Sequence, residues 1–413
     1  MRNSRHAKNH RPDVARMPRM SARNRLPLSE YSAERIVLIK PSALGDIVHA
    51  LPVLTALRRR FPRAHISWVV NRGYAPLLQG HRDLDEVLPY DRHVAQRGWR
   101  AAARSWSAFL RQLRQRRFDL AIDLQGLFRT GVMMLATRAP RRVGLGTARE
   151  GAVWTYTDVL PVPDINAIHA VDRYWRVAEA LGVGDGPKEF HLPVTDEARN
   201  WAETVTNGYP RPWLMLGPGA RWMTKRWPPE HFAALARRAG ERFGATVFLV
   251  GGDDERAAAS AVRQRLTGSS RDLTGQTTLP QLAALLQRAD VMLANDTGPL
   301  HLAAALGRPV VAPYTCTTVR RCGPYGWQEN AIETSVSCGG SFIKRCSRRT
   351  CMDELTPDRL WPALSQALRA TNPARFVANT NGCQIGREQT AVQSSATVPV
   401  ERSSGRRSHC RRI

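Results

Sequence analysis

The chain has 413 residues, of which 43% are hydrophobic and 23% are charged, and its formal net charge is +26. This length and balance fit two globular domains, each with its own core, and exclude a fibrous or wholly disordered protein. The excess of basic residues favours binding to phosphates on nucleotides, anionic lipids or nucleic acids.

The two ends of the chain differ in composition from the middle. Residues 1–33 are rich in Arg, Asn and Pro, and residues 372–413 mix Thr, Ser, Gln, Gly and Arg with little apolar periodicity. We predict that both are disordered basic tails. The sequence predicts neither a membrane-spanning helix nor a signal peptide. We therefore expect a cytoplasmic protein, whose basic surface also suits peripheral binding at the inner face of the cytoplasmic membrane.

Short apolar runs alternate with amphipathic stretches from residue 34 to residue 185, which indicates βα units and a parallel sheet. The predicted strands of this first domain are Arg35–Lys40, His65–Val70, Glu86–Pro89, Leu120–Asp123 and Arg142–Gly144. Its predicted helices are Asp46–Arg60, Ala75–Leu78, Arg100–Arg116 and Ala167–Leu181.

A break follows, which we place at residues 186–211 as a linker region because Gly and Pro cluster near both of its ends. A second βα series then fills residues 212–371. Its predicted strands are Trp213–Gly217, Thr246–Gly251, Asp290–Asn295 and Pro309–Pro313. Its predicted helices are Pro229–Phe243, Asp254–Leu266, Leu279–Arg288, Leu300–Gly307 and Pro357–Ala370. Two open α/β domains imply a cleft between them, with ligands at the carboxyl ends of the strands.

The turn after the first strand, Lys40-Pro41-Ser42-Ala43-Leu44-Gly45-Asp46, lacks the G-x-G-x-x-G pattern of dinucleotide-binding proteins. It places the Asp46 carboxylate at the top of the first sheet. That residue serves either as a capping residue in the first helical turn or as a general base that takes a proton from an acceptor hydroxyl.

Two loops of the second domain favour a diphosphate. Gly217 and Gly219 end its first strand with small residues, which either form a turn or let a ligand approach the backbone. Lys225 and Arg226 stand just before a Pro-Pro-Glu helix start, where cations oppose the helix dipole unless an anion shares the site. A solvated basic loop is the alternative.

A second helix start follows at Asp296-Thr297-Gly298, with His301 in its first turns. Its unpaired backbone N–H groups favour an anion, although Asp296 could simply cap the helix and His301 could be a core residue. Glu255 lies in an acidic turn that either caps a helix or binds a ribose.

Five cysteines gather late in the chain without any C-x-x-C pair, so we expect packed or redox-labile thiols and no metal site. These are Cys316, Cys322, Cys338, Cys346 and Cys351.

The chain resembles the bacterial heptosyltransferases of glycosyltransferase family 9, which build the inner core of lipopolysaccharide. The stretches that carry the resemblance are Arg35–Pro52, Asp123-Leu124-Gln125-Gly126, Gly146-Thr147-Ala148-Arg149-Glu150, Lys225-Arg226-Trp227-Pro228 and Asp296–Leu302. The motif at Gly146–Glu150 is most like that of heptosyltransferase I. Residues 218–223 depart from the Thr-rich donor loop of that enzyme, so the class of donor is better defined than its identity.

The resemblance implies a GT-B architecture, in which a Rossmann-like acceptor domain precedes a Rossmann-like nucleotide-sugar domain. It also implies inverting transfer of heptose from ADP-heptose to a glycolipid of the Kdo-lipid A type, without a metal or another cofactor. Asp46 would be the base and Lys225 would bind the diphosphate. The remaining residues implied for the donor are Gly217, Gly219, Glu255, Asp296, Thr297, Gly298 and His301, with Asp254 as an alternative to Glu255. Those implied for the acceptor are Ser42, Gln125, Arg149 and Glu150.

Two other functions remain open from the residues. The same fold could use another nucleotide-sugar, or a protein or polysaccharide acceptor. A basic nucleic-acid-binding protein is the alternative outside enzymes, but its basic tails lack interleaved aromatic residues apart from Tyr31 and Phe376. We therefore expect a nucleotide-sugar and a glycolipid as partners, at an anionic membrane surface, and no nucleic acid.

Overall fold

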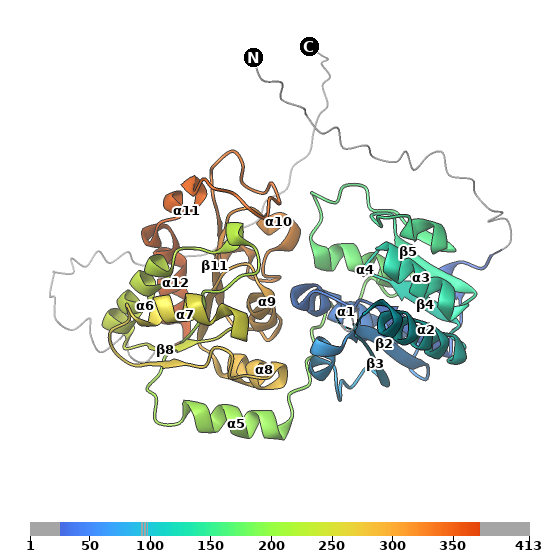
Figure 1. Ribbon diagram of the computed structural model, residues 1–413, viewed down its shortest axis with the longest axis horizontal. Helices are drawn as coiled ribbons and strands as arrows, with labels where there is room; N and C mark the ends of the chain where they lie inside the picture. Colours follow the sequence, from blue (N-terminus) through green and yellow to red (C-terminus); the bar gives the residue numbers. More distant parts are fainter. Residues whose placement is uncertain (1–24, 92–93, 95, 97, 372–413) are drawn as a thin grey trace, which may run out of the picture. The chain divides into compact units, whose positions relative to one another are not determined.

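The structure is a computed structural model that describes residues 25–91, 94, 96 and 98–371. These residues form two six-stranded parallel sheets surrounded by helices (Figure 1), which confirms the predicted α/β class. The strand order of the first sheet is β3-β2-β1-β4-β5-β6. The order of the second sheet is β12-β11-β10-β7-β8-β9, which, read from its other end, is the same arrangement. Both are therefore the doubly wound arrangement of Rossmann-like domains.

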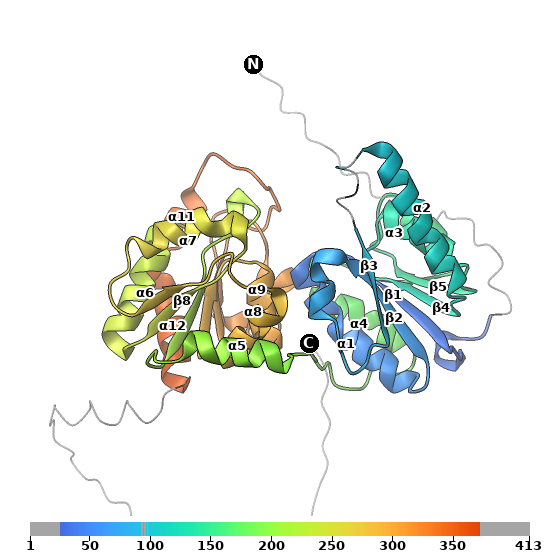
Figure 2. The same cartoon turned by 60° about the horizontal axis from the view of Figure 1, so that its bottom comes forward.

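The N-terminal lobe comprises β1–β6 and helices α1–α4. Its strands are β1 (Arg35–Ile39), β2 (His65–Asn71), β3 (Glu86–Tyr90), β4 (Leu120–Asp123), β5 (Arg141–Leu145) and β6 (Asp158–Leu160). Its helices are α1 (Leu44–Arg60), α2 (Trp99–Gln115), α3 (Phe128–Thr137) and α4 (Ala170–Ala180), with 3-10 turns η2 (Leu28–Glu30), η3 (Arg72–Leu77) and η5 (Ala152–Thr155). Figure 2 shows α1 and α4 on one side of the sheet and α2 and α3 on the other.

The C-terminal lobe comprises β7–β12 and helices α5–α12. Its strands are β7 (Trp213–Gly217), β8 (Thr246–Leu249), β9 (Ser270–Asp272), β10 (Val291–Ala294), β11 (Val310–Tyr314) and β12 (Ala331–Glu333). Its helices are α5 (Asp196–Thr206), α6 (Pro229–Phe243), α7 (Arg256–Arg263), α8 (Leu279–Arg288), α9 (Gly298–Ala305), α10 (Val319–Cys322), α11 (Thr350–Glu354) and α12 (Pro357–Thr371). The 3-10 turns are η6 (Met223–Lys225), η7 (Asp253–Glu255) and η8 (Gln328–Asn330).

The central strands explain why the sequence predicts them well. All residues of β4, β7, β8, β10 and β11 are buried, as are all but the first of β1. Strands covered on both faces read as continuous apolar runs. The edge strands β6, β9 and β12 have only three residues each, too few for an apolar run, and the prediction lacks them.

Several predicted elements need correction. Residues 25–33, assigned to the N-terminal tail, include η2 and bury Leu28 and Ala33; the rest of both predicted tails lies outside the described residues. The predicted helix Ala75–Leu78 is the 3-10 turn η3, which contains Pro76. The predicted linker, residues 186–211, holds α5, which packs against α8 of the C-terminal lobe. The domain limits themselves stay a prediction.

The prediction also lacks helix α3, because Gly131 in its middle is unfavourable in a helix. An ideal Cβ on Gly131 would lie 3.2 Å from Ala152 Cα, so the glycine allows η5 to approach α3. A glycine inside a helix normally weakens a sequence-based helix prediction.

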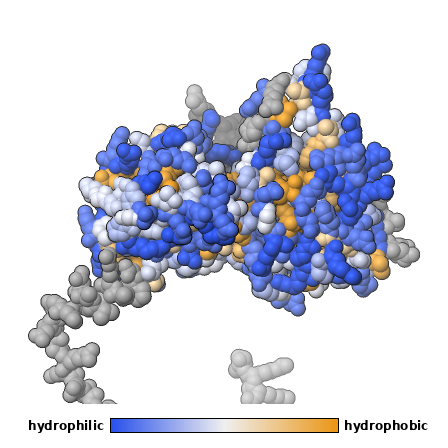
Figure 3. Space-filling view, turned by 90° about the horizontal axis from the view of Figure 1, so that it is seen from below, coloured by the Kyte–Doolittle hydropathy of each residue, from blue (hydrophilic) through white to orange (hydrophobic). Residues whose placement is uncertain are grey.

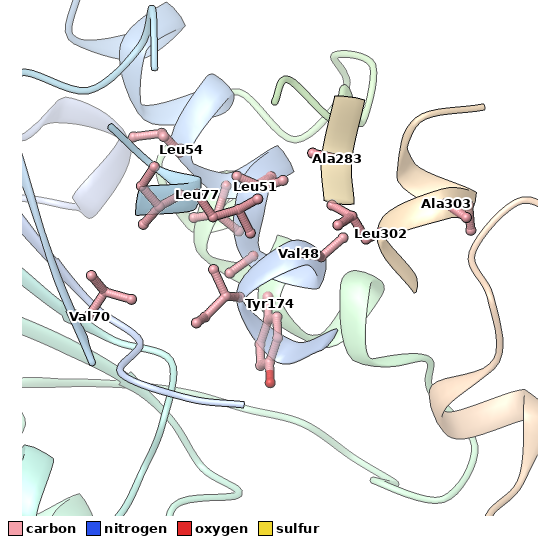
Figure 4. Close-up of a cluster of buried hydrophobic side chains, with 14 of the residues drawn as sticks. Val48, Leu51, Leu54, Val70, Leu77, Tyr174, Ala283, Leu302 and Ala303 are labelled. Atoms are coloured by element: carbon pink, nitrogen blue, oxygen red, sulfur yellow. The ribbon is translucent and has the colours of Figure 1, made fainter. Parts of the chain in front are cut away.

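One apolar core runs from the N-terminal lobe into the C-terminal lobe through α1. Val48 and Leu51 of α1 belong to the same buried cluster as Ala283 of α8 and Leu302 of α9. Figure 4 shows Val48 directed toward Leu302. Twelve of the seventeen residues of α1 are buried, since this helix packs on its own sheet, on α4 and on α9.

Candidate active site

A cavity of about 580 Å³ opens where the start of α1 meets the loops of the C-terminal lobe. The predicted site residues that line it are Asp46, Lys225, Glu255, Asp296, Thr297, Gly298 and His301. The residue proposed as base and most of those proposed for the donor therefore share one cavity. Asp254, the alternative to Glu255, lines it as well.

Asp46 is the third residue of α1, and its carboxylate caps the start of this helix while it stays partly exposed in the cavity. Its Oδ2 accepts a hydrogen bond from the Ala43 backbone N–H at 3.3 Å, as a capping residue does. The same oxygen lies 3.7 Å from Lys40 Nζ, and Oδ1 accepts a hydrogen bond from the Tyr174 hydroxyl at 3.0 Å. The side chain is still 39% exposed, so it can also reach a ligand.

These contacts set the protonation state of Asp46. Desolvation raises the pKa of this carboxyl, but Lys40, the Ala43 N–H and the Tyr174 hydroxyl together lower it below its usual value. Hydrogen bonds and positive charge stabilise the ionised form of a carboxyl. Asp46 is thus a carboxylate at neutral pH and is able to accept a proton.

Asp296 lies between β10 and α9 and is surrounded by partners. Its Oδ2 is 2.5 Å from Lys225 Nζ and accepts a hydrogen bond from Thr317 Oγ1 at 2.7 Å. Its Oδ1 is 3.0 Å from His301 Nε2. Burial raises the pKa of Asp296, but Lys225 and His301 overcome this and hold the pKa well below its usual value. Lys225 is therefore held by an ion pair and is not a free cation.

His301 in turn contacts His49 of the N-terminal lobe. His301 Nδ1 and His49 Nε2 are 3.2 Å apart, and His49 Nδ1 is buried without a partner. Since the carboxylate of Asp296 can only accept, His301 donates from Nε2. If His301 Nδ1 then accepts from His49 Nε2, the unpartnered atom of His49 is a lone pair and no buried N–H is left without an acceptor. Orphaned buried N–H groups are rare, so this arrangement of protons is favoured.

The ring of His49 also contacts His169, the N-cap residue of α4, whose Nε2 lies 3.0 Å from the carbonyl oxygen of Gly323 in the C-terminal lobe. Burial and the neighbouring imidazoles lower the pKa of His49 well below its usual value. Burial, opposed by the Gly323 carbonyl, lowers the pKa of His169 to about 4. Both rings are neutral at pH 7, and they join the lobes through hydrogen bonds without adding charge.

Two glycines allow the starts of α1 and α9 to meet. An ideal Cβ on Gly45 would lie 2.6 Å from His301 Cδ2, and one on Gly298 would lie 2.6 Å from Leu44 Cδ2. Contacts this short do not occur with a real Cβ. Glycine at both positions is therefore required for this approach of the two helices.

Asn295 joins three loops behind the cavity. Its Oδ1 accepts a hydrogen bond from the Trp227 backbone N–H at 3.1 Å. Its Nδ2 donates to the carbonyl oxygens of Pro218 and Gly219, at 2.8 and 3.3 Å. The loops after β7 and β10 and the turn before α6 are thereby fixed to one another.

The sequence matches the family model of glycosyltransferase family 9 (heptosyltransferase) over residues 106–351. The chain belongs to glycosyltransferase family 9. It is thus a glycosyltransferase, as its motifs predict.

Similar proteins support the same family. The chain is 25% identical over 313 residues to the lipopolysaccharide core heptosyltransferase OpsX of Haemophilus influenzae, covering 74% of this chain and 86% of that protein. It is 29% identical over 374 residues to lipopolysaccharide heptosyltransferase 1 of Pseudomonas aeruginosa, covering 83% of this chain and all of that protein. The solved structure of the ADP-heptose lipopolysaccharide heptosyltransferase II of Escherichia coli is similar with a TM-score of 0.65 and 25% identity, covering 81% of this chain and 99% of that one. The predicted GT-B architecture is confirmed.

The remaining predicted residues of this glycosyltransferase do not line the cavity. Gly217 ends β7, and a Cβ placed on it would lie 3.0 Å from Ala294 Cβ. A Cβ placed on Gly219 would lie 2.3 Å from Glu255 Cδ. Both glycines thus serve close packing. Ser42 donates its backbone N–H to Gln125 Oε1 at 3.3 Å.

Arg149 and Glu150 are exposed in the turn after β5, where Arg149 donates its backbone N–H to the Gly126 carbonyl oxygen at 2.8 Å. The structure therefore brings the four predicted acceptor residues into neighbouring loops at the carboxyl edge of the first sheet. They do not join the donor residues in the cavity lining.

Sequence reasoning expected the start of α6 to contribute to the diphosphate site. The 3-10 turn η6 carries Lys225 to the cavity instead, while Pro228 and Pro229 are outside its lining. Sequence reasoning also missed His49, although its spacing of three residues from Asp46 places both on neighbouring positions of one helix. No local signal marks Thr317 or Phe342, which reach the cavity from later loops.

The five described cysteines are unpaired, and Cys322 lines the cavity with a pKa that burial raises to about 12. Within the described ranges, no three His, Cys, Asp or Glu residues are arranged to hold a metal ion. None of the described helices is both long enough and apolar enough to span a membrane.

Proposed function

We propose that this glycosyltransferase moves heptose from ADP-heptose to a glycolipid acceptor of the Kdo-lipid A type, with inversion at the anomeric carbon. The observation that carries the proposal is that Asp46, from the N-terminal lobe, and Lys225 with Asp296, from the C-terminal lobe, line the same cavity. The names of the relatives given above support heptose as the sugar and lipopolysaccharide core as the product.

In the proposed reaction the Asp46 carboxylate accepts the proton of the acceptor hydroxyl as its oxygen attacks the anomeric carbon. The bond from that carbon to the diphosphate oxygen breaks, and ADP leaves on the opposite side. Only one base is needed for such an in-line displacement, and the low pKa of Asp46 keeps it ionised.

Negative charge grows on the diphosphate as it leaves. The backbone N–H groups at the start of α9 and the Lys225 ammonium group stabilise that charge. Lys225 already compensates Asp296, so we propose that the lysine is shared between this carboxylate and the diphosphate. Asp296 and His301 would then orient the sugar, and Glu255 would bind the ribose.

The donor is the part of this proposal that needs the most direct test. Calorimetric titration with ADP-heptose, ADP-glucose and UDP-glucose should give binding to ADP-heptose and much weaker binding to the UDP-sugar. Transfer of heptose to a delipidated Kdo-containing acceptor should then be measured directly. Preference for another nucleotide-sugar, or transfer to a protein or polysaccharide in place of the Kdo-containing acceptor, would overturn the proposal.

We further propose that the enzyme works at the inner face of the cytoplasmic membrane, where such an acceptor would present its sugar. The basic composition of the chain supports this location.

A further inference from the structure

Three large side chains stand exposed at the carboxyl edge of the first sheet. Trp154, Trp99 and Phe128 are 77%, 75% and 63% exposed, the highest values among the large hydrophobic residues of the described chain. Trp99 begins α2 after β3, Phe128 begins α3 after β4, and Trp154 lies in η5 after β5. We call these three residues the aromatic rim.

The three residues of the aromatic rim are carried by neighbouring elements. Helix α3 packs against α2 on one side and against η5 on the other. The Phe128 backbone N–H donates to Glu150 Oε2 at 3.2 Å, and the Trp154 ring lies over Gly151, the next residue in that turn. Figure 3 shows one face of this lobe, on which hydrophobic side chains gather in a band among hydrophilic ones.

The charge around the aromatic rim is strongly positive. The arginines at the starts of these elements are Arg100 and Arg104 in the first turns of α2, Arg129 beside Phe128, and Arg149 in the turn before η5. Glu150, the acidic residue of these turns, accepts a hydrogen bond from the Phe128 N–H.

The Arg100 guanidinium lies 5.3 Å from the centre of the Trp99 ring, and that of Arg129 lies 5.6 Å from the centre of the Tyr90 ring at the end of β3. An indole at the surface beside arginines is suited to the boundary of a lipid bilayer, where the ring enters the headgroup region and the guanidinium contacts phosphate.

The rim also borders the loops that hold the predicted acceptor residues. Gln125 precedes the start of α3, and the turn with Arg149 and Glu150 contacts both Gly126 and Phe128. A bilayer touching the rim would therefore present a glycolipid headgroup next to these loops.

We propose that Trp99, Phe128 and Trp154, with the arginines around them, dock the N-terminal lobe on an anionic lipid bilayer beside the acceptor loops. This inference rests on the proposed function for its choice of partner. It differs from a general attraction to membranes, because it assigns binding to one edge of one sheet.

The test is sedimentation of the full chain with vesicles of phosphatidylcholine, with and without phosphatidylglycerol. The variant Trp99→Ser/Phe128→Ser/Trp154→Ser should lose at least about tenfold in partition onto anionic vesicles, since each ring contributes apolar burial. The matched control is Leu26→Ser/Val159→Ser, which removes two exposed apolar side chains away from the rim. Val159 lies in β6, and the Leu26 carbonyl oxygen accepts a hydrogen bond from Arg141, the first residue of β5. This control should bind as the parent does.

A second variant tests the charge. Arg100→Gln/Arg104→Gln should weaken binding to anionic vesicles by roughly fivefold per arginine and leave binding to neutral vesicles unchanged. Arg237→Gln/Arg242→Gln, on exposed positions of α6, is the control. Both variants keep the terminal segments, so their contribution cancels in each comparison.

Equal binding by the parent and the rim variant, or an equal loss in the control, would overturn the inference. So would a parent protein without preference for anionic vesicles. Transfer to a delipidated, soluble acceptor separates this result from the proposed function: the rim variant should keep the parent's kcat/KM there. An enzyme that binds vesicles through the rim but transfers no heptose would refute the proposed function and leave the docking surface intact.

Discussion

Two carboxylates, one from each lobe, line the same cavity, yet their surroundings differ. Asp46 stands at the start of α1, which follows β1, and Asp296 stands just before α9, which follows β10. Both strands are central in their sheets. The side chain of Asp46 is 39% exposed, whereas that of Asp296 is 5% exposed and has contacts with Lys225, Thr317 and His301. The exposed carboxylate is free to meet a substrate, and the buried one mainly orients its neighbours.

The largest effect should come from Asp46→Asn. Removal of a general base lowers kcat by about a thousandfold, while the affinity for ADP-heptose and the unfolding temperature stay near those of the parent. Rapid-quench kinetics and calorimetry measure the two quantities. Asp196→Asn is the control, because Asp196 is likewise an acidic residue in a first helical turn, at α5, and is exposed. Retained turnover in Asp46→Asn would show that another group takes the proton.

Asp296→Asn should lower stability as well as activity. Breaking a buried ion pair leaves the partner charge uncompensated, so the free energy of unfolding falls by about 3 kcal/mol. Urea unfolding provides the measurement. Asp253→Asn is the control, because Asp253 pairs with Arg256 at the same 2.5 Å distance but is 83% exposed; we expect a loss below about 1 kcal/mol there.

The pH dependence sharpens this second prediction. The folded pKa of Asp296 lies below its unfolded value of about 3.9, so its contribution is present above that pH and is lost as the pH falls through the folded pKa. The difference in stability between the parent and Asp296→Asn should therefore shrink in acid. A constant or growing difference would contradict the ion pair.

Gly45→Ala tests the close approach of α1, which carries Asp46, to His301, which contacts Asp296. Its Cβ would collide with His301, so we expect a loss of about 1–3 kcal/mol in stability together with a lower kcat. Gly240→Ala is the control, since that glycine lies within α6 and its Cβ would make only ordinary contacts, the nearest at 3.7 Å. This change should stabilise by about 0.5–1 kcal/mol. Equal behaviour of both variants in thermal unfolding would refute the required close approach.

The smallest effect is expected for Tyr174→Phe. The Tyr174 hydroxyl stabilises the ionised form of Asp46, so its removal raises the pKa of that carboxyl and moves the acid limb of kcat/KM to higher pH. Tyr325→Phe is the control, because Tyr325 donates a similar hydrogen bond, 2.8 Å long, to Asp172 outside the cavity lining. The pH–rate profile should shift only in Tyr174→Phe. An identical limb in both variants would remove Tyr174 from the account.

The sequence predicts the site better where its chemistry is local. Asp46, Lys225 and Asp296 each lie in the segment that follows a strand, and the repeating βα pattern alone suggests that such segments meet. Their partners could not be predicted in the same way. Tyr174 lies 128 residues beyond Asp46, and His49 meets His301 across 252 residues. Contacts at such separations follow from how the lobes pack, which no single motif encodes.

The helices and strands, too, are predicted best where the local sequence determines them. Central strands such as β7 match their predicted limits because burial on both faces gives an unbroken apolar run. Helix α5 was hidden in a segment assigned as a linker, although Thr195 caps it and its first turn is acidic. The capping residue and acidic first turn indicate a helix, but the Gly and Pro residues on either side favour a loop.

The side chain of Asn295 connects three loops behind the cavity. Its amide accepts from Trp227 at one end and donates to Pro218 and Gly219 at the other. Because the two ends are chemically different, rotating this amide by half a turn would oppose donor to donor and acceptor to acceptor. The orientation of one amide thus depends on three loops at once, and a ligand that displaces any of these loops breaks a hydrogen bond of Asn295.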